Sequence, residues 1–352
     1  MIQEPIKLTS YSKGAGCGCK IAPNVLQEIL QSSIPIFNQN NLLVGNDTND
    51  DASVVDLGNG TAIISTTDFF MPIVDSPFDF GKIAAANSIS DVYAMGGKPI
   101  MAIAILGWPI EKLSVSLAQE VLDGARTICN QVGISLSGGH SIDSAEPIFG
   151  LAVTGSISIK NLKKNNTAQL GDYLFITKPI GVGIMSTAQK RGVIQPHHEE
   201  SMIHQMSKIN FIGEQLGEIS GVNAMTDITG FGLLGHLTEM AKESGLSAEL
   251  YYSDIPLMEG IREYLAQRII PDATYRNWNS YSKTTAFEKG VNVMEAFNIL
   301  PDPQTNGGLL ISVKESSIQQ VVDLFKQNGL SDFIKPIGKI VTKSEKIIEV
   351  KN

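Results

Sequence analysis

The chain has 352 residues, which is enough for two domains, each with its own hydrophobic core. Its composition is 43% hydrophobic and 18% charged, which is typical of a globular protein and excludes a disordered one. The net charge of −9 and the lack of long basic runs exclude nonspecific nucleic-acid binding, because phosphate contacts require basic surfaces. An acidic protein can still bind polyphosphate when a divalent metal supplies the positive charge.

The sequence also argues against secretion and membrane insertion. The N-terminal residues lack the hydrophobic region of a signal peptide. The longest apolar stretch, Pro99–Ile110, is too short to span a bilayer. The three cysteines, Cys17, Cys19 and Cys129, do not form the pattern of a secreted disulfide framework. We therefore expect a cytoplasmic protein with reduced thiols and no membrane association.

The first half of the chain predicts alternating strands and helices. The expected elements, in chain order, are a helix over 22–31, a strand near 42–44, an acidic loop, a hairpin through Gly58–Gly60 whose second strand runs into Asp68, a helix over 80–97, a strand Ile100–Leu106, a helix Ser114–Gln131, a strand over 134–141 that ends in a glycine loop, and a strand over 147–158. Cys129 falls within an amphipathic helix, so we expect it in the core. This pattern indicates an α+β domain.

The second half begins near residues 164–174 and continues in the same style. The expected elements are a strand Tyr173–Thr177, helices Val182–Arg191 and Glu200–Ile219, strands Ser247–Tyr251 and Gly308–Val313, a helix Ser316–Gln327 and C-terminal strands, with a long surface loop over 268–290. We divide the chain into a flexible glycine-rich region over residues 1–20, an N-terminal domain over 21–158 and a C-terminal domain over 159–352.

A glycine-rich loop near the N-terminus carries two of the cysteines. Residues 14–20 read GAGCGCK, and the three glycines disfavour a helix or a central strand, so we expect a mobile, exposed loop. A neighbouring cation lowers the pKa of a thiol, and Lys20 follows Cys17 by three residues. The pair indicates a nucleophile, or a carrier of a soft anion, beside a cation. A Cys-x-Cys metal site remains the alternative, although Cys129 is the only other thiol and no histidine is near in sequence.

Carboxylates form the second signal. They are Asp47, Asp50 and Asp51 in one acidic loop, Asp68 at a strand end, Asp91 in a helix, and Asp227 before a glycine turn. Each of them except Asp91 has an ordinary structural interpretation as a turn former or cap. Asp91 lies in a mostly apolar helix, four residues after Asn87 and on the same face, where a carboxylate is costly unless it is paired or binds metal.

The donor set points to magnesium and phosphate. Carboxylate oxygens without a histidine or cysteine cluster suit Mg²⁺, which completes its shell with phosphate oxygens. The glycine stretches Ser137–Ser141 and Gln304–Gly308 either let backbone N–H groups approach a phosphate or are plain turns. His140 is a candidate polar contact in the first stretch. The sequence has no Walker A motif and no complete dinucleotide fingerprint.

Six segments together resemble the selenophosphate synthetase (selenide, water dikinase) family. They are the stretches 14–20, 45–60, 64–99, 137–142, 225–237 and 302–310, in this order along the chain. The Cys-Gly-Cys-Lys sequence is the specific part of the resemblance. The acidic and glycine segments are shared more loosely with aminoimidazole ribonucleotide synthetase and its relatives.

The resemblance implies a two-domain fold of the aminoimidazole ribonucleotide synthetase type and a homodimer formed through the N-terminal domains, with ATP at the dimer interface. It also implies the reaction ATP + selenide + water → selenophosphate + AMP + phosphate, whose product is the selenium donor for selenocysteine and selenouridine. A selenium-delivery protein is a further expected partner. The implied site residues are Cys17 and Lys20 in catalysis, Asp51, Asp91 and Asp227 on Mg²⁺, and Lys20, Thr48, Asn49, Asp50, Asp68, Asp91, Gly139, His140 and Ser141 on ATP.

Two other functions stay open on the sequence alone. One is an ATP-using synthetase or kinase of the same superfamily with another substrate, which the cysteine–lysine loop disfavours. The other is a non-catalytic protein that binds metal or responds to redox conditions. Turnover that depends on selenide separates the first from the expected reaction, and a lack of nucleotide binding in the presence of Mg²⁺ would favour the second.

Overall fold

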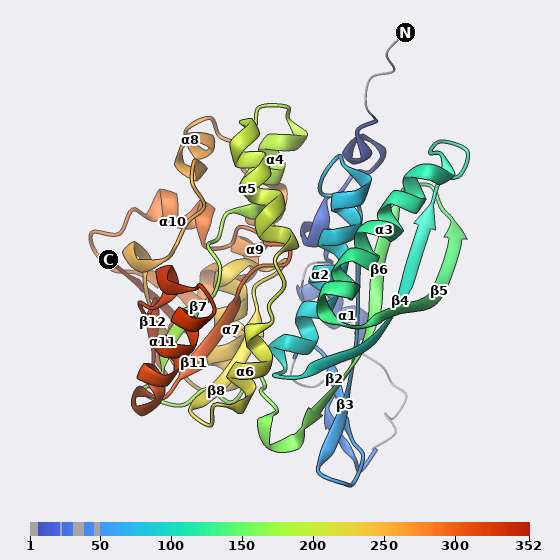
Figure 1. Ribbon diagram of the computed structural model, residues 1–352. Helices are drawn as coiled ribbons and strands as arrows, with labels where there is room; N and C mark the ends of the chain where they lie inside the picture. The colour runs from blue at the N-terminus through green and yellow to red at the C-terminus, as the bar shows by residue number, and fades with distance from the viewer. Residues whose placement is uncertain (1–5, 22, 31–38, 46–49) are drawn as a thin grey trace.

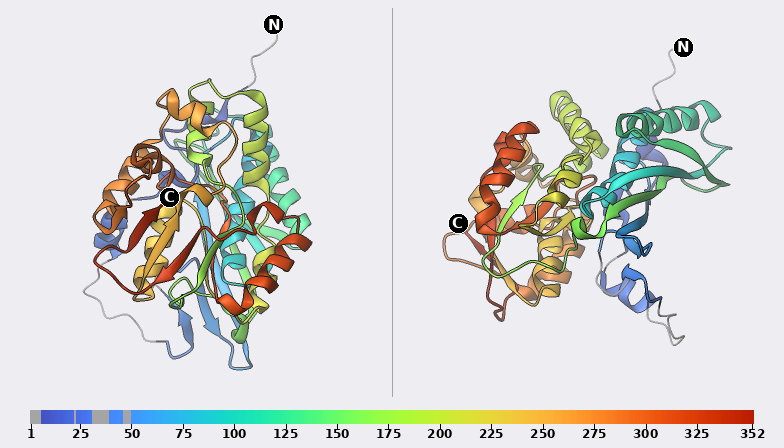
Figure 2. Two further views of the ribbon diagram at one scale, coloured as in Figure 1. Left: turned by 90° about the vertical axis from the view of Figure 1, so that its left-hand side faces the viewer. Right: turned by 60° about the horizontal axis from the view of Figure 1, so that its bottom comes forward.

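The structure, a computed structural model, describes residues 6–21, 23–30, 39–45 and 50–352. Its elements form two mixed β-sheets with accompanying helices, one sheet in each half of the chain (Figure 1). The two halves lie side by side in the views of Figures 1 and 2. The predicted α+β class is therefore confirmed.

The N-terminal half is built on a six-stranded sheet with the order β1-β2-β3-β6-β4-β5. Its strands are β1 (Leu42–Val44), β2 (Ser53–Asp56), β3 (Thr61–Phe70), β4 (Lys98–Trp108), β5 (Ser135–Asp143) and β6 (Ile148–Ser158). All neighbouring strands are antiparallel except β4 and β5, which are parallel. Strand β5 forms one edge of this sheet.

Two long helices cover one face of the N-terminal sheet, α2 (Pro77–Ala94) and α3 (Val115–Val132). Helix α2 begins where the Ser76 side chain accepts a hydrogen bond from the backbone N–H of Asp79 at 3.2 Å, with Pro77 in the first turn. It packs against β3 and β6 on one side and against the C-terminal half on the other, so almost all of its residues are buried. Polar residues of α2 can therefore face both halves of the molecule.

The opposite face of this sheet exposes large apolar side chains. Phe69 of β3, Met101 and Ile103 of β4, and Ile142 of β5 are between 38% and 59% exposed. Successive residues of a strand point to opposite faces, which explains why Phe70 and Ala102, their neighbours in sequence, are buried. These four side chains therefore form an apolar surface on this face of the sheet.

The C-terminal half is built on a seven-stranded sheet with the order β10-β13-β9-β12-β7-β11-β8. Its strands are β7 (Tyr173–Ile176), β8 (Val222–Asp227), β9 (Ser247–Tyr251), β10 (Thr285–Phe287), β11 (Leu309–Val313), β12 (Gly338–Val341) and β13 (Ile348–Lys351). Its helices are α4 (Val182–Lys190), α5 (Pro196–Ser207), α6 (Ile212–Glu218), α7 (Gly232–Glu243), α8 (Ile261–Ala266), α9 (Asp272–Tyr281), α10 (Val293–Ile299) and α11 (Ile318–Gln327). The short elements η2 (Gly16–Cys19) and α1 (Pro23–Leu30) precede both sheets.

The expected surface loop over residues 268–290 is wrong, because this segment contains helix α9 and strand β10. Apart from Tyr281, helix α9 buries small or polar side chains, so the apolar periodicity of its sequence is weak. One of them, Asn277, donates from its amide to the carbonyl oxygens of Gly230 and Pro301 at 2.8 and 2.9 Å. Polar contacts therefore hold this helix in a position that hydrophobic patterning does not reveal.

Three further boundaries differ from the expectation. The single helix expected over Glu200–Ile219 is two helices, because the chain breaks at Asn210, whose amide donates to Ser90 and to Gly307. Asp68 does not end its strand, since β3 continues to Phe70. The expected glycine loop at 137–141 is part of strand β5, where a Cβ on Gly139 would lie 2.1 Å from the Ala104 carbonyl oxygen. That glycine allows the close approach of two strands.

Cys129 is buried in α3, as expected. No helix in the described part of the chain is long and apolar enough to cross a membrane.

Candidate active site

The glycine–cysteine loop folds into the groove between the two halves of the chain. The N–H of Gly16 donates to the Met71 carbonyl oxygen at 3.1 Å, and the N–H of Cys17 donates to Thr305 Oγ1 at 3.0 Å. Gly16 has a φ of 51°, and a Cβ there would lie within 2.5 Å of Ile73 and Thr305. The Cys17 side chain is 2% exposed, whereas Cys19 is half-buried. The expectation that both thiols are exposed is wrong for Cys17.

The amide of Asn87 is the centre of a buried network around Cys17. Its Oδ1 accepts from the Cys17 thiol at 3.3 Å and from the backbone N–H of Asn306 at 2.7 Å. Its Nδ2 donates to the Asp68 carboxylate. Asn87 is completely buried on α2, so a single side chain connects the loop, strand β3 and the turn before β11.

The Cys17 thiol is held in its protonated form. Burial raises its pKa well above the usual value, and the negative charge of Asp68 adds to this shift. The positive charge of Lys20 opposes it but is the weaker effect. The predicted lowering by Lys20 is therefore present, but burial outweighs it, so the net direction expected from the sequence is wrong.

Lys20 is surrounded by negative charge. Asp68 makes the largest contribution to raising the pKa of its ammonium, ahead of Cys17, Asp91 and Asp227, while burial acts in the opposite direction. Its side chain still has access to solvent. Cys17, Lys20 and Asp68 also line one cavity of about 300 Å³. A positive charge that acts on a thiol and lines an open cavity can meet an incoming anion.

Three carboxylates from distant parts of the chain influence one another. Asp51 lies just before β2, Asp91 lies on α2, and Asp227 ends β8. Asp91 Oδ2 accepts from Thr66 Oγ1 at 2.5 Å, and Asp51 Oδ1 accepts from Thr226 Oγ1 at 2.8 Å. Asp91 is 8% and Asp227 1% exposed. The fold therefore places the three residues that the resemblance assigns to a metal close enough to interact electrostatically.

Burial and mutual repulsion disfavour the charged forms of the three carboxylates in the absence of a cation. Burial is the largest cause that raises the pKa of Asp51 and Asp91, and the charge of Asp227 raises both further. Burial also raises the pKa of Asp227 to about 6, against a hydrogen bond from Ser90 and the charge of Lys20. Asp51 Oδ2 and Asp227 Oδ2 are buried and have no hydrogen-bond partner among the described residues. Oxygens of this kind suit a hard cation.

The described part of the chain contains no group of three or more His, Cys, Asp or Glu side chains placed to hold a metal ion unaided. This is compatible with Mg²⁺, which binds through one or two protein carboxylates and keeps water or phosphate as its other ligands. Asp50 and Asp51 line a further cavity of about 430 Å³, together with Thr66 and Thr67. Asp50 Oδ1 also accepts from the N–H of Asn165 at 2.7 Å.

The remaining residues expected to bind ATP are not gathered at this place. Thr48 and Asn49 lie outside the described residues. Gly139, His140 and Ser141 lie on β5, at the sheet edge, and are exposed. Two strands separate β5 from β3, which corresponds to a distance of about 14 Å between them. Within one chain, therefore, the β5 segment does not join the carboxylates.

Several residues of this region were not predicted as site residues. They are Thr66, Asn87, Lys178, Thr226, Thr305 and Asn306. Asn87 had a signal, since it shares a helix face with Asp91. Thr305 and Asn306 belong to a glycine turn that the sequence left undecided between a plain turn and a phosphate loop. Nothing in the sequence pointed to Lys178, whose burial lowers its pKa to about 7.

Comparison with known proteins identifies the family. The model of the AIR synthase related protein N-terminal domain matches residues 49–157, and that of the C-terminal domain matches residues 169–351. A selenide, water dikinase of Aeromonas hydrophila is 53% identical over 347 residues, which is 98% of this chain and 99% of that protein. A selenide, water dikinase of Haemophilus influenzae (strain 86-028NP) is 53% identical over 353 residues, which covers both chains completely.

Solved structures share the fold at low sequence identity. Thiamine-monophosphate kinase from Stenotrophomonas maltophilia K279a has a TM-score of 0.65 at 18% identity and covers 89% of this chain and 92% of its own. The hydrogenase maturation protein HypE in complex with ATP has a TM-score of 0.64 at 17% identity, covering 86% of this chain and 85% of its own. Both agree with the predicted two-domain fold. The chain belongs to the selenide, water dikinase family of AIR synthase related proteins.

Proposed function

We propose that the chain synthesises selenophosphate from selenide and ATP, with AMP and orthophosphate as the other products. Curated relatives that match nearly the whole chain are named selenide, water dikinase. The observation that carries the proposal is the Cys17–Asn87–Asp68 network, which holds a thiol beside Lys20 and next to a cluster of buried carboxylates. An ordinary kinase site does not need a thiol at this position.

Cys17 and Lys20 handle the selenium atom in this proposal. Selenide is already an anion at neutral pH, so it needs little help from a general base. The Cys17 thiol, whose pKa burial raises, offers a soft S–H contact to the selenium anion rather than competing as a nucleophile. The Lys20 ammonium neutralises charge as the anion approaches a phosphate, which is the main requirement of phosphoryl transfer.

Asp51, Asp91 and Asp227 are the residues that would hold Mg²⁺. Their mutual repulsion and the unpartnered oxygens of Asp51 and Asp227 support this assignment. The ion would neutralise and orient the phosphates of ATP. Asp50, Thr48, Asn49 and the β5 residues remain candidates for contacts to the nucleotide.

Two successive phosphoryl transfers account for the products. Hydrogen selenide anion attacks the γ-phosphorus, a selenium–phosphorus bond forms, and the bond from that phosphorus to the bridging oxygen breaks, which leaves ADP bound in the site. Water then attacks the β-phosphorus of the retained ADP, which gives AMP, orthophosphate and one proton. The loop around Cys17 separates these steps by excluding water during the first transfer.

We also propose a homodimer formed through the N-terminal domains. The apolar surface of Phe69, Met101, Ile103 and Ile142 is suited to burial against a second copy. A partner chain could then bring its β5 segment toward the carboxylates. We expect an Ile103→Glu variant to form a smaller oligomer than the unchanged chain. Light scattering after size-exclusion chromatography measures this, and an unchanged size would contradict the interface.

Three further points remain predictions of the same proposal. They are the domain division at residues 20 and 158, the cytoplasmic location and a selenium-delivery partner. Each follows from the resemblance or the composition described above.

Phosphorus NMR of an anaerobic reaction tests the function. With ATP, Mg²⁺ and selenide, we expect selenophosphate, AMP and orthophosphate in equal amounts. A reaction without selenide controls for simple ATP hydrolysis. Stoichiometric accumulation of ADP without AMP would show that the chain is a single-transfer kinase, and turnover that ignores selenide would indicate another substrate.

A further inference from the structure

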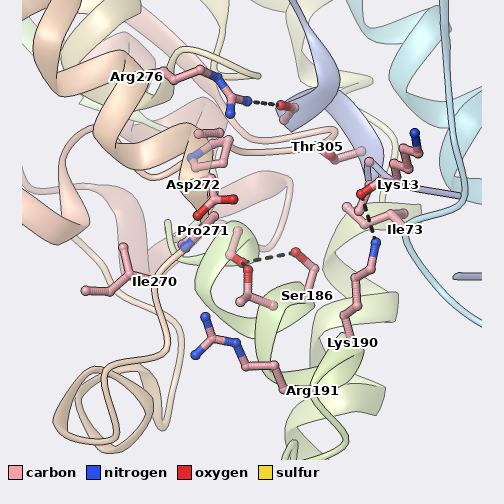
Figure 3. A pocket seen from close by; sticks show the side chains of 17 residues that line it. Lys13, Ile73, Ser186, Lys190, Arg191, Ile270, Pro271, Asp272, Arg276 and Thr305 are labelled. Atoms are coloured by element: carbon pink, nitrogen blue, oxygen red, sulfur yellow. Dashed lines mark hydrogen bonds between the residues drawn. The ribbon is translucent and has the colours of Figure 1, made fainter. Parts of the chain in front are cut away.

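A third cavity lies behind the glycine–cysteine loop, on the side of the C-terminal half (Figure 3). It has a volume of about 290 Å³ and is bounded by the loop residues Lys13–Ala15 and Gly18, helix α4, the start of helix α9 and the turn at Pro303 and Thr305. Thr305 lines it and also accepts the hydrogen bond from the Cys17 N–H. Only the loop therefore separates this cavity from the thiol.

The cavity carries an excess of positive charge. Four cationic side chains line it, Lys13, Lys190, Arg191 and Arg276, against one carboxylate, that of Asp272. Among the residues that the structure describes, none of the four cations pairs with a carboxylate within 4.0 Å. In a chain with a net charge of −9, such a concentration of unpaired positive charge is unusual.

Backbone carbonyl groups fix three of these cations in place. Lys190 Nζ donates to the carbonyl oxygens of Ser12 and Lys13, both at 3.1 Å. Arg276 Nη2 donates to the Gly18 carbonyl oxygen at 2.8 Å, and Arg191 Nη1 donates to that of Arg268 at 3.2 Å. An ammonium has three donors and a guanidinium has five, so each cation keeps donors that these contacts do not use.

The fixed positions argue against an ordinary solvated surface. Exposed lysine and arginine side chains usually lose their orientation to solvent, whereas here two of them are held by the loop itself. Arg276 and Arg191 lie on opposite sides of the cavity in Figure 3. The charges of Lys190 and Arg276 also act on Cys19, where they oppose the increase in thiol pKa that burial causes. Their field therefore converges on the loop.

We propose that this cavity binds a tetrahedral oxyanion of the phosphate type. Charge-assisted hydrogen bonds from arginine and lysine are the usual means of recognising such an anion. Because Lys190 and Arg276 bridge the cavity and the loop, a bound oxyanion also stabilises the loop in the position seen here, and loop closure strengthens anion binding by the same factor. This site is separate from the carboxylates and does not depend on the reaction proposed above.

Calorimetric titration of orthophosphate into the full chain tests the proposal. The solution contains EDTA, which prevents a metal-mediated phosphate site at the carboxylates, and chloride keeps the ionic strength constant. We expect one site, weakened about tenfold in Arg191→Gln, because a single charge-assisted contact is lost. Arg191 donates to the Arg268 carbonyl oxygen, between helices α8 and α9, and not to the glycine–cysteine loop. This variant therefore leaves the described loop contacts in place.

Arg126→Gln is the matched control, since it removes the same charge from an exposed position on α3 outside the cavity. It should bind orthophosphate like the unchanged chain, and thermal melting establishes that both variants are folded. No orthophosphate binding beyond the chloride blank, or equal binding by Arg191→Gln and the unchanged chain, would overturn the proposal.

Hydrogen exchange gives a second readout that a merely structural role would not change. At an orthophosphate concentration near the Kd of the unchanged chain, exchange in residues 12–20 should slow clearly in the unchanged chain and much less in Arg191→Gln. A parallel titration with AMP distinguishes two sources of the same chemistry. Arg191-dependent binding that is tighter for orthophosphate indicates a free oxyanion, and tighter binding of AMP indicates the phosphate end of a larger molecule. Exchange that is insensitive to either ligand would contradict the link to the loop.

Discussion

The glycine–cysteine loop separates two charged regions that differ in sign and in construction. On its front side, Asp51, Asp91 and Asp227 are collected in a site where burial and mutual repulsion raise their pKa values. On its back side, Lys190 and Arg276 are accessible to solvent and are held by loop carbonyl groups. On the front side the charge of Lys20 only partly offsets the rise in carboxylate pKa that burial causes, whereas the cations of the back side are exposed to solvent.

This difference predicts where the molecule is sensitive. Buried charges of like sign reduce the stability of the unliganded fold, so a bound cation stabilises it. Exposed cations that donate to carbonyl groups change the stability of the fold little, so removing them should also change it little. Changes at the front side or at Cys17 should therefore alter both activity and stability, and changes at the back side should be mild.

The largest expected effect is at the thiol itself. Cys17→Ser should reduce selenophosphate formation by roughly a thousandfold or more, the scale on which removal of one member of a catalytic unit acts. Cys19→Ser should be much milder, because only Cys17 contacts Asn87. The product assay by phosphorus NMR measures both. Near-normal activity in Cys17→Ser would remove this residue from the proposed chemistry.

The next effect concerns the residue that joins the loop to the front side. Asn87→Leu leaves the Cys17 thiol, the Asn306 N–H and Asp68 without their partner. Each unsatisfied buried group costs about 1–3 kcal/mol, so we expect a clear loss of thermal stability together with a loss of turnover. Melting curves and initial rates measure the two effects.

Asn130→Leu, on the exposed part of α3, is the control for Asn87→Leu. A stable Asn87→Leu protein with full activity would mean that the network does not position Cys17.

A smaller effect is the pH dependence of the free energy of unfolding, which the front side should cause in metal-free protein. The folded-state pKa of Asp227 is about 6, above its ordinary value of 3.8. A raised pKa means that the folded protein holds the proton more tightly than the unfolded chain does. The stability that protonation of Asp227 contributes is therefore fully present below about pH 4 and is lost as the pH rises through about 6. The free energy of unfolding in EDTA should fall by on the order of 2–3 kcal/mol over this range.

Asp227→Asn should reduce that fall and raise the melting temperature of the metal-free protein at pH 7. It should also lose the stabilisation that Mg²⁺ and ATP give to the unchanged chain. Asp332→Asn, at an exposed position, serves as the control. If Asp227→Asn keeps the full pH dependence and gains as much from Mg²⁺ and ATP, Asp227 is not part of a strained metal site.

The sequence predicted the elements whose patterns are local. Helix α2, strand β9 and the burial of Cys129 followed from periodicity and turn residues. Helix α9 was missed because it packs through Asn277 and other polar side chains, which carry no apolar pattern. The state of the Cys17 thiol was also missed. A sequence shows that Lys20 is near, but it does not show how deeply tertiary packing buries the sulfur.

The candidate site shows the same limit. The carboxylates were recognised one by one, since each stands in an unusual sequence setting, and the fold then brings Asp51, Asp91 and Asp227 within electrostatic reach of one another. Thr305 lies 288 residues after Cys17, so no local rule could pair them. The cavity behind the loop was not predicted, because its cations come from three separate segments.

The smallest expected effect tests the back side of the comparison. Lys190→Gln removes the ammonium that donates to Ser12 and Lys13, at a position open to solvent where each hydrogen bond contributes about 1 kcal/mol or less. The start of the loop should then open more often, so hydrogen exchange in residues 12–16 should accelerate a few-fold while the melting temperature changes little. Turnover should fall less than about tenfold, because Cys17 keeps its contacts to Asn87 and Thr305. Lys326→Gln, an exposed lysine on α11, controls for the lost charge. A loss of activity in Lys190→Gln as severe as that in Cys17→Ser would show that the two sides of the loop are not energetically separate, and that the cations behind it belong to the chemistry in front.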